Sequence, residues 1–150
     1  METQQHPILQ QIADRAMELV HAETVVVAIA ESDGEIVHYA AALGKYAEAI
    51  RGKRGASATS GLCGTAFAGN NPVLVCQTQG DPRVRQDWAQ SLGITTALAV
   101  PLYDAGELVG ALMALNRRDR QAFDAAAEQV WADYAPEAAS RVRDYLAAIA

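Results

Sequence analysis

Two apolar runs joined by a tight turn constrain this fold more than any other feature of the sequence. Residues 95–103 and 107–116 flank Asp104-Ala105-Gly106, which is typical of a three-residue hairpin turn with a left-handed glycine. The second run carries apolar residues on both faces of the expected strand: Leu108, Leu112 and Ala114 on one, and Val109, Ala111, Met113 and Leu115 on the other. We therefore expect other elements to cover both sides of the sheet.

A second hairpin is predicted nearer the N-terminus. The runs 24–31 and 34–40 meet around Asp33-Gly34, a pair that suits the positive φ angles of a type I′ turn. Residues 73–75 predict a further short strand. Pro101 has no backbone N–H and predicts a bulge or an unpaired position within 95–103.

Helical segments are predicted at both ends of the chain and in its middle. Apolar residues recur at helical spacing from Pro7 to His21 and from Ala122 to Ala148. Shorter helices are expected at 61–69 and 86–92, each followed or ended by glycine. Pro136 either kinks the last helix or begins a second one. Together these elements predict one α+β domain over residues 1–150, with segment 40–94 covering one sheet face above a cavity.

Composition excludes several function classes. The net charge is −6, and the densest basic stretches, Arg51-Gly-Lys53-Arg54 and Arg117-Arg118 with Arg120, are short, so nucleic acid is not an expected partner. The sequence has neither a signal peptide nor an apolar run long enough to span a membrane, which predicts a soluble, cytoplasmic protein with reduced cysteines. Two cysteines and three histidines show no metal-ligand spacing.

Several short stretches resemble the GAF domain family. They are Gly61-Leu-Cys-Gly-Thr-Ala66, Asn71-Pro-Val-Leu-Val75, Asp81-Pro82-Arg83, Leu92-Gly-Ile94, Ala99-Val-Pro-Leu102, Gly106 and Leu108-Val-Gly110. The resemblance implies a PAS-related sheet of five or six antiparallel strands, with terminal helices on one face and a ligand pocket on the other. It also implies a regulatory domain that senses a small molecule, binds a partner copy, or does both.

Candidate ligand-binding residues follow from this expectation. A pocket on the second sheet face would be mostly apolar with a few polar groups, and the sequence does not specify its ligand or cofactor. The residues we expect there are His38, Cys63, Cys76, Arg83, Trp88, Tyr103 and Met113.

Cys63 supports an alternative, enzymatic interpretation. A helix N-terminus stabilises a thiolate, and the string around Cys63 is similar to one in free methionine-(R)-sulfoxide reductases, which are GAF proteins. The further cysteines of those enzymes have no counterpart here, since the Lys53 region and segment 77–93 lack cysteine. The sensory interpretation is therefore preferred.

Two other ligand classes of the family fit less well. The Asn116-Arg117 and Phe123 positions resemble part of a cyclic-nucleotide motif, but Ala127 stands where that motif has aspartate. Neither cysteine is followed by histidine, which disfavours a covalently attached bilin and leaves a noncovalent chromophore or haem open.

The last helix predicts a homodimer. Trp131, Tyr134, Val142 and Tyr145 approximate a heptad face, while Phe123 and Val130 are expected in the domain's own core. The first helix, with Ile8, Ile12 and Leu19, would complete a bundle across a two-fold axis. No effector domain follows this helix, so we expect an effector protein as partner or a longer parent protein.

Overall fold

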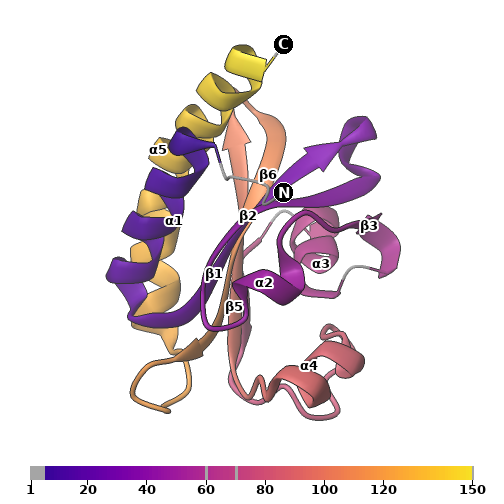
Figure 1. Cartoon of the computed structure of the whole chain (residues 1–150), viewed down its shortest axis with the longest axis vertical. Coiled ribbons are helices and arrows are strands. Elements are labelled where there is room, and N and C mark those ends of the chain that lie inside the picture. The colour runs from indigo at the N-terminus through magenta and orange to yellow at the C-terminus, as the bar shows by residue number, and fades with distance from the viewer. Residues whose placement is uncertain (1–5, 60, 70, 150) are drawn as a thin grey trace.

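A single antiparallel sheet of six strands runs through the molecule in the order β3-β2-β1-β6-β5-β4 (Figure 1). The computed structural model describes residues 6–59, 61–69 and 71–149, with the side chain of Trp88 excepted. The strands are β1 (Ala22–Glu31), β2 (Ile36–Gly44), β3 (Arg54–Ala56), β4 (Val73–Val75), β5 (Ala97–Asp104) and β6 (Glu107–Arg117). The expected α+β fold with a five- or six-stranded antiparallel sheet is confirmed.

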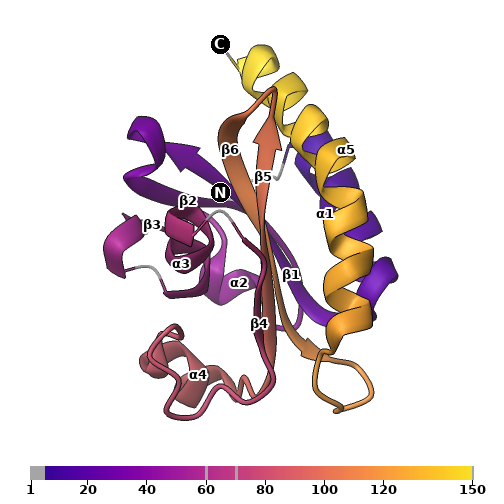
Figure 2. The same cartoon turned by 180° about the vertical axis from the view of Figure 1, so that it is seen from behind.

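Helices cover both faces of this sheet. α1 (Pro7–Val20) and α5 (Ala125–Ile149) lie side by side on one face, here called the helical face (Figures 1 and 2). α2 (Ala47–Ile50), α3 (Gly61–Gly69) and α4 (Gln86–Leu92) lie on the other, here called the loop face. Each layer has its own buried apolar cluster against the sheet. The two-sided apolar strands are explained by this three-layer arrangement.

Both predicted hairpins form. β1 pairs with β2, and the connection Ser32–Gly34 has positive φ angles of 52°, 56° and 87°. β5 pairs with β6, but Asp104 pairs with Glu107, so the turn contains only Ala105 and Gly106, with φ angles of 51° and 80°. The expected three-residue turn is therefore wrong. Two left-handed residues close the hairpin with the twist of a type I′ turn.

A bulge next to Pro101 changes which way two side chains face. Leu102 pairs with Gly110 and Tyr103 with Leu108, so Val109 is the extra residue in β6. Consequently Val109 belongs to the cluster of the helical face, whereas Leu108 packs on the loop face. Strict alternation predicted the opposite sides for these two residues, because one inserted residue reverses the side-chain parity beyond it.

The long helix α5 is continuous through Pro136. Which of two neighbouring side chains of α5 faces the core differs from the prediction. Trp131 is fully buried and its indole N–H donates to the Ala16 carbonyl of α1 at 3.0 Å, whereas Val130 is 36% exposed. Val142 is also fully buried within the domain. Trp131 and Val142 are therefore core residues, not members of an outward-facing seam.

Candidate functional site

The Gly-Leu-Cys-Gly-Thr-Ala motif forms the first turns of α3, and its glycines allow a close approach of backbones. Gly61 has φ of +59°. A Cβ atom on Gly64 would lie 1.8 Å from the Ser57 carbonyl oxygen, far inside van der Waals contact. Glycine at this position therefore lets α3 pack directly against the turn Ser57–Thr59. That packing turns Leu62 and Cys63 toward the sheet, where both are buried.

Cys63 lies deep in the loop-face core. Its side chain is fully buried, and its Sγ lies 3.8 Å from the Sδ of Met113 on β6. Burial raises the pKa of the Cys63 thiol to about 12. This outweighs the stabilisation expected from the helix N-terminus, because desolvation penalises the charged thiolate. The thiol is protonated at neutral pH, and we do not assign it the nucleophilic role that the reductase alternative requires.

Between α3, α4 and the sheet, the described residues line only a small space. A void of about 20 Å³ remains there, lined by Leu62, Val84, Arg85, Ala89, Ile94, Met113 and Leu115. A single water needs about 10–15 Å³ of such volume. This space is therefore too small for an organic ligand unless α3 or α4 moves away from β6.

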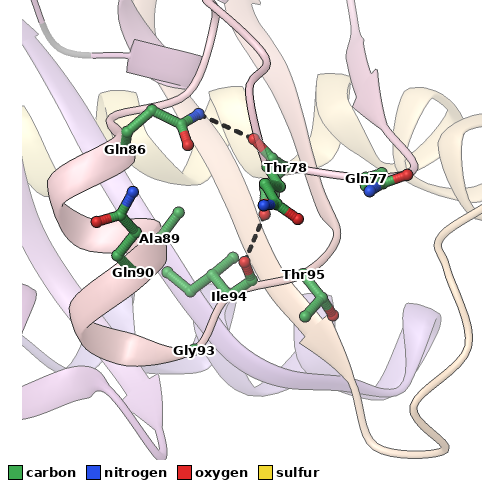
Figure 3. Close-up of a pocket in the computed structure, with 9 residues that line it drawn as sticks. Gln77, Thr78, Gln86, Ala89, Gln90, Gly93, Ile94 and Thr95 are labelled. Carbon is green, nitrogen blue, oxygen red and sulfur yellow. Dashed lines mark hydrogen bonds between the residues drawn. The ribbon is translucent and has the colours of Figure 1, made fainter.

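Two larger pockets flank that void at the surface. One, of about 350 Å³, lies between α4 and the segment after β4 (Figure 3). We call it the glutamine pocket; it is lined by Gln77, Thr78, Gln79, Gln86, Ala89, Gln90, Gly93, Ile94 and Thr95. The other, of about 610 Å³, lies over α3 and includes Ser57, Gly64, Thr65, Val84 and Arg85. The void shares Ala89 and Ile94 with the first pocket and Val84 and Arg85 with the second, so one segment, 84–94, separates the three spaces.

The wall of the glutamine pocket is held by a short hydrogen-bond network. Thr78 is buried and its hydroxyl donates to the Ile94 carbonyl (Figure 3). The side-chain amide of Gln86 donates to the carbonyls of Thr78 at 2.9 Å and Asp81 at 3.0 Å, and its oxygen accepts from the Gly80 N–H at 3.2 Å. These bonds fix α4 to the chain that leaves β4 and use the whole Gln86 amide internally.

Asn116 connects the pocket wall to the end of β6. It is buried, has φ of 62°, and its side-chain oxygen accepts from the backbone N–H groups of Thr95 at 2.7 Å and Thr96 at 3.3 Å. Its side-chain nitrogen donates to the Gly93 carbonyl at 3.0 Å. The hydroxyl of Thr96 accepts from the Phe123 N–H at 3.1 Å, just before α5 begins. A chain of bonds therefore runs from the pocket to the start of α5.

A family comparison identifies this arrangement. The model of the GAF domain matches residues 3–138. The chain belongs to the GAF domain family. The comparison with curated proteins gave no significant match.

Solved GAF structures share the fold of this GAF domain. The GAF-B domain of DevS from Mycobacterium smegmatis has 18% sequence identity and a TM-score of 0.73, with 93% of each chain covered. The free methionine-R-sulfoxide reductase from Neisseria meningitidis, solved with its substrate, has 21% identity and a TM-score of 0.73, covering 90% of this chain and 75% of that one. The GAF domain of an Acinetobacter phosphoenolpyruvate-protein phosphotransferase has 15% identity and a TM-score of 0.76, covering 93% and 82%.

His38, expected in the pocket, lies on the opposite face of this GAF domain. It pairs with Ile29 of the helical-face cluster and with Arg54, and directly opposed residues share a face. Its Nδ1 lies 3.2 Å from Glu31, which also accepts from Arg54 Nε at 2.9 Å. Burial, together with the Arg54 charge, lowers the pKa of His38, although Glu31 opposes the shift. His38 belongs to a surface ion cluster on the helical face, away from the loop-face pockets.

The other expected residues are dispersed. Cys63 and Met113 meet in the core, but Cys76 is exposed, with its Sγ 3.8 Å from the Phe123 carbonyl. Arg83 pairs with Asp81 at 2.6 Å in an exposed loop. Tyr103 is half-buried near the β5–β6 turn, and burial raises its pKa. Trp88 is on α4, and its side chain lies outside the described residues.

The glutamines were not anticipated from the sequence as functional residues, and Asn116 was noted only as part of the stretch that resembles a cyclic-nucleotide motif. The sequence signal for the glutamines was their clustering between residues 77 and 90, where Gln77, Gln79, Gln86 and Gln90 all line the pocket. Among the described residues, no group of three or more histidine, cysteine, aspartate or glutamate side chains is arranged to hold a metal ion. Within the described chain, no helix is long and apolar enough to cross a membrane.

Proposed function

We propose that this chain is a regulatory GAF domain that binds a small molecule on its loop face and transmits the change to α5. GAF domains are commonly sensory or regulatory, and this one matches the family model over residues 3–138. The observation that carries the proposal is the shared wall: Ile94 borders both the glutamine pocket and the inner void. The neighbouring residues Gly93, Thr95 and Thr96 are bonded to Asn116.

The segment around α4 is suited to move as a unit. It lies between Gly80 and Gly93, which have φ angles of +77° and +70° and, among the described residues, no atom within 4 Å of an added Cβ. A ligand that wedges between α4 and β6 would enlarge the void and displace Ile94. Because Gly93, Thr95 and Thr96 are tied to Asn116, that displacement reaches the β6–α5 connection.

Native mass spectrometry of the purified protein tests the proposal. We expect a retained small molecule that is released on denaturation. Hydrogen exchange with and without that molecule should then show protection confined to 77–95 and 116–124. Protection restricted to α1 or to the β1–β2 turn would contradict the proposal, since neither borders the loop-face pockets.

We also propose that α1 and α5 form a homodimer interface. Partly buried apolar residues on these helices include Ile8, Leu19, Tyr134, Tyr145 and Leu146, and Val130 and Ile149 are 36% and 56% exposed. Apolar surface of this kind is typical of protein interfaces. Light scattering at several concentrations should give a dimer mass, and Val130→Lys should shift it toward the monomer, whereas Gln129→Lys should not. A monomer at every concentration would contradict the interface.

A further inference from the structure

We propose that the glutamine pocket binds an uncharged, planar ligand that carries a carboxamide or lactam group. The inference rests on the proposed function, because it names the ligand class of the same loop face. Its lining contains glutamine, threonine, alanine, isoleucine and glycine, and no ionisable side chain among the described lining residues. Its volume of about 350 Å³ lies within the range of roughly 300–1,000 Å³ found for small-molecule sites.

The arginine and aspartate side chains next to α4 form ion pairs with one another, which disfavours an ionic ligand. Arg83 pairs with Asp81 at 2.6 Å, and Arg85 pairs with Asp87 at 2.8 Å. Both of these arginines therefore already have an adjacent carboxylate. An ion entering the pocket would lose hydration without gaining an opposite charge, which disfavours charged ligands.

The side-chain amides of the glutamines determine which polar group of a ligand can bind in the pocket. The Gln86 amide is used by the backbone, but Gln77, Gln79 and Gln90 are exposed, and their side chains have no hydrogen-bond partner within the described chain. A side-chain amide presents donors and an acceptor in one plane. A carboxamide or lactam edge presents the complementary pair, so one glutamine makes two bonds with it. A carboxylate only accepts hydrogen bonds, so it would use only the glutamine NH2 group. An ammonium group only donates, so it would use only the glutamine oxygen.

Two residues of the pocket lining give it an apolar surface. Ala89 and Ile94 are 7% and 5% exposed and form the wall shared with the inner void. Gln86 and Gln90 extend from α4 beside Ala89, with Thr78 and Ile94 facing them (Figure 3). A flat ring can pack on Ala89 and Ile94 while its amide edge meets the glutamines. This combination of a flat apolar body and an amide edge is what the pocket selects.

Three isosteric probes separate the ligand classes: benzamide, benzoate and benzamidine, which are neutral, anionic and cationic. We expect benzamide to shift the backbone NMR signals of Thr78, Gly93 and Thr95 in a saturable manner, with benzoate and benzamidine at least about tenfold weaker. Gln90→Leu should weaken benzamide about tenfold, because a pair of amide hydrogen bonds is lost. Gln79→Leu serves as a second variant, and the exposed Gln10→Leu on α1 is the control and should bind as the wild type does.

Either charged probe binding these residues as tightly as benzamide would overturn the ligand class and leave the sensing function standing. Equal benzamide affinity in wild type, Gln90→Leu and Gln79→Leu would also overturn it. If none of the probes shifts residues 77–95, the inference fails. If, in addition, no molecule retained by the purified protein protects that segment from exchange, the proposed sensing function fails with it.

Discussion

The side-chain carbonyl of Asn116 accepts the backbone N–H of Thr95 at 2.7 Å, and this bond joins the end of β6 to the wall of the glutamine pocket. Asn116 is buried and lies at φ of 62°, a left-handed conformation that asparagine tolerates better than most residues. One residue thus meets a backbone requirement and a hydrogen-bonding requirement at the same place.

Asn116→Ala should destabilise the domain by about 3 kcal/mol. The substitution leaves the N–H groups of Thr95 and Thr96 and the Gly93 carbonyl without their present partner. Thr96 is buried, and a buried unpaired group costs roughly 1–3 kcal/mol, whereas water can bond to the exposed Thr95 and Gly93 groups. Alanine also tolerates φ of 62° less well than asparagine. Urea unfolding followed by circular dichroism measures the change. Gln121→Ala, at an exposed position in the same connection, is the control and should change stability by less than about 0.5 kcal/mol. Equal effects of the two substitutions would contradict the role of the Asn116 amide.

Gly64→Ala and Gly69→Ala form a matched pair within α3. The added methyl group at Gly64 would meet the Ser57 carbonyl oxygen at 1.8 Å, so we expect a loss of at least about 2 kcal/mol. At Gly69 nothing lies within 4 Å, and alanine should be neutral or stabilise the helix by up to about 1 kcal/mol. Thermal unfolding of the two variants compares them directly, and similar melting temperatures would refute the close packing of α3.

The two thiols should differ in reactivity. Cys76 is exposed, whereas Cys63 is fully buried with its pKa raised to about 12. An aromatic disulfide reagent at mildly alkaline pH should modify Cys76 rapidly in the native protein, and Cys63 only after denaturation. Cys76→Ser should then leave no fast-reacting thiol, while Cys63→Ala should leave one. Rapid native modification of Cys63 would show that the loop-face core opens readily.

Stability should decrease below the ordinary pKa of His38, which is 6.5, because the folded protein holds that pKa lower. The unfolded chain then binds more protons than the folded chain. The stability contributed by neutral His38 is present above pH 6.5 and is lost as the pH falls through this value toward the lowered one. Glu31 has a pKa lowered from 4.5, so its own contribution is lost only at more acidic pH.

Thermal unfolding at about pH 7.5 and about pH 5.5 brackets the His38 window. The melting temperature should fall more in the wild type than in His38→Gln, which cannot titrate at this position. An identical pH dependence in both proteins would show that His38 is not desolvated beside Arg54.

Local chemistry made most of the fold predictable. Asp33-Gly34 and Ala105-Gly106 supply positive φ angles, and both hairpins form around them. The helix boundaries lie within about three residues of the predicted positions. For example, α5 begins at Ala125 rather than at Ala122. The predicted side-chain faces were wrong where a bulge interrupts the alternation of β6. Because Val109 is an extra residue, it lies on the helical face and Leu108 on the loop face, the reverse of the prediction.

The site was less predictable, because periodicity gives the face of an element and not its position in space. Cys63 and Met113 were assigned to one pocket and do meet, but the space that described residues line beside Met113 is only about 20 Å³. His38 is on the other face because its register follows Ile29, which no local pattern revealed. The burial of Val130 and Trp131 was predicted the wrong way round, because the apolar residues of α5 cover a wide face that allows either residue to point inward. The hydrogen bond from Trp131 to the Ala16 carbonyl of α1 favours burial of Trp131.

The neighbouring positions of β1 and β6 in the sheet have a consequence for synthesis on the ribosome. β1 is complete at Glu31, but its central partner spans Glu107–Arg117. Until that strand has emerged, the nascent β1–β2 hairpin has one unpaired edge of Val25, Val26 and Val27, and α1 has no α5 against which to bury its apolar stripe. We therefore expect the domain to close late in synthesis, and a chain that stops before β6 to be prone to aggregation.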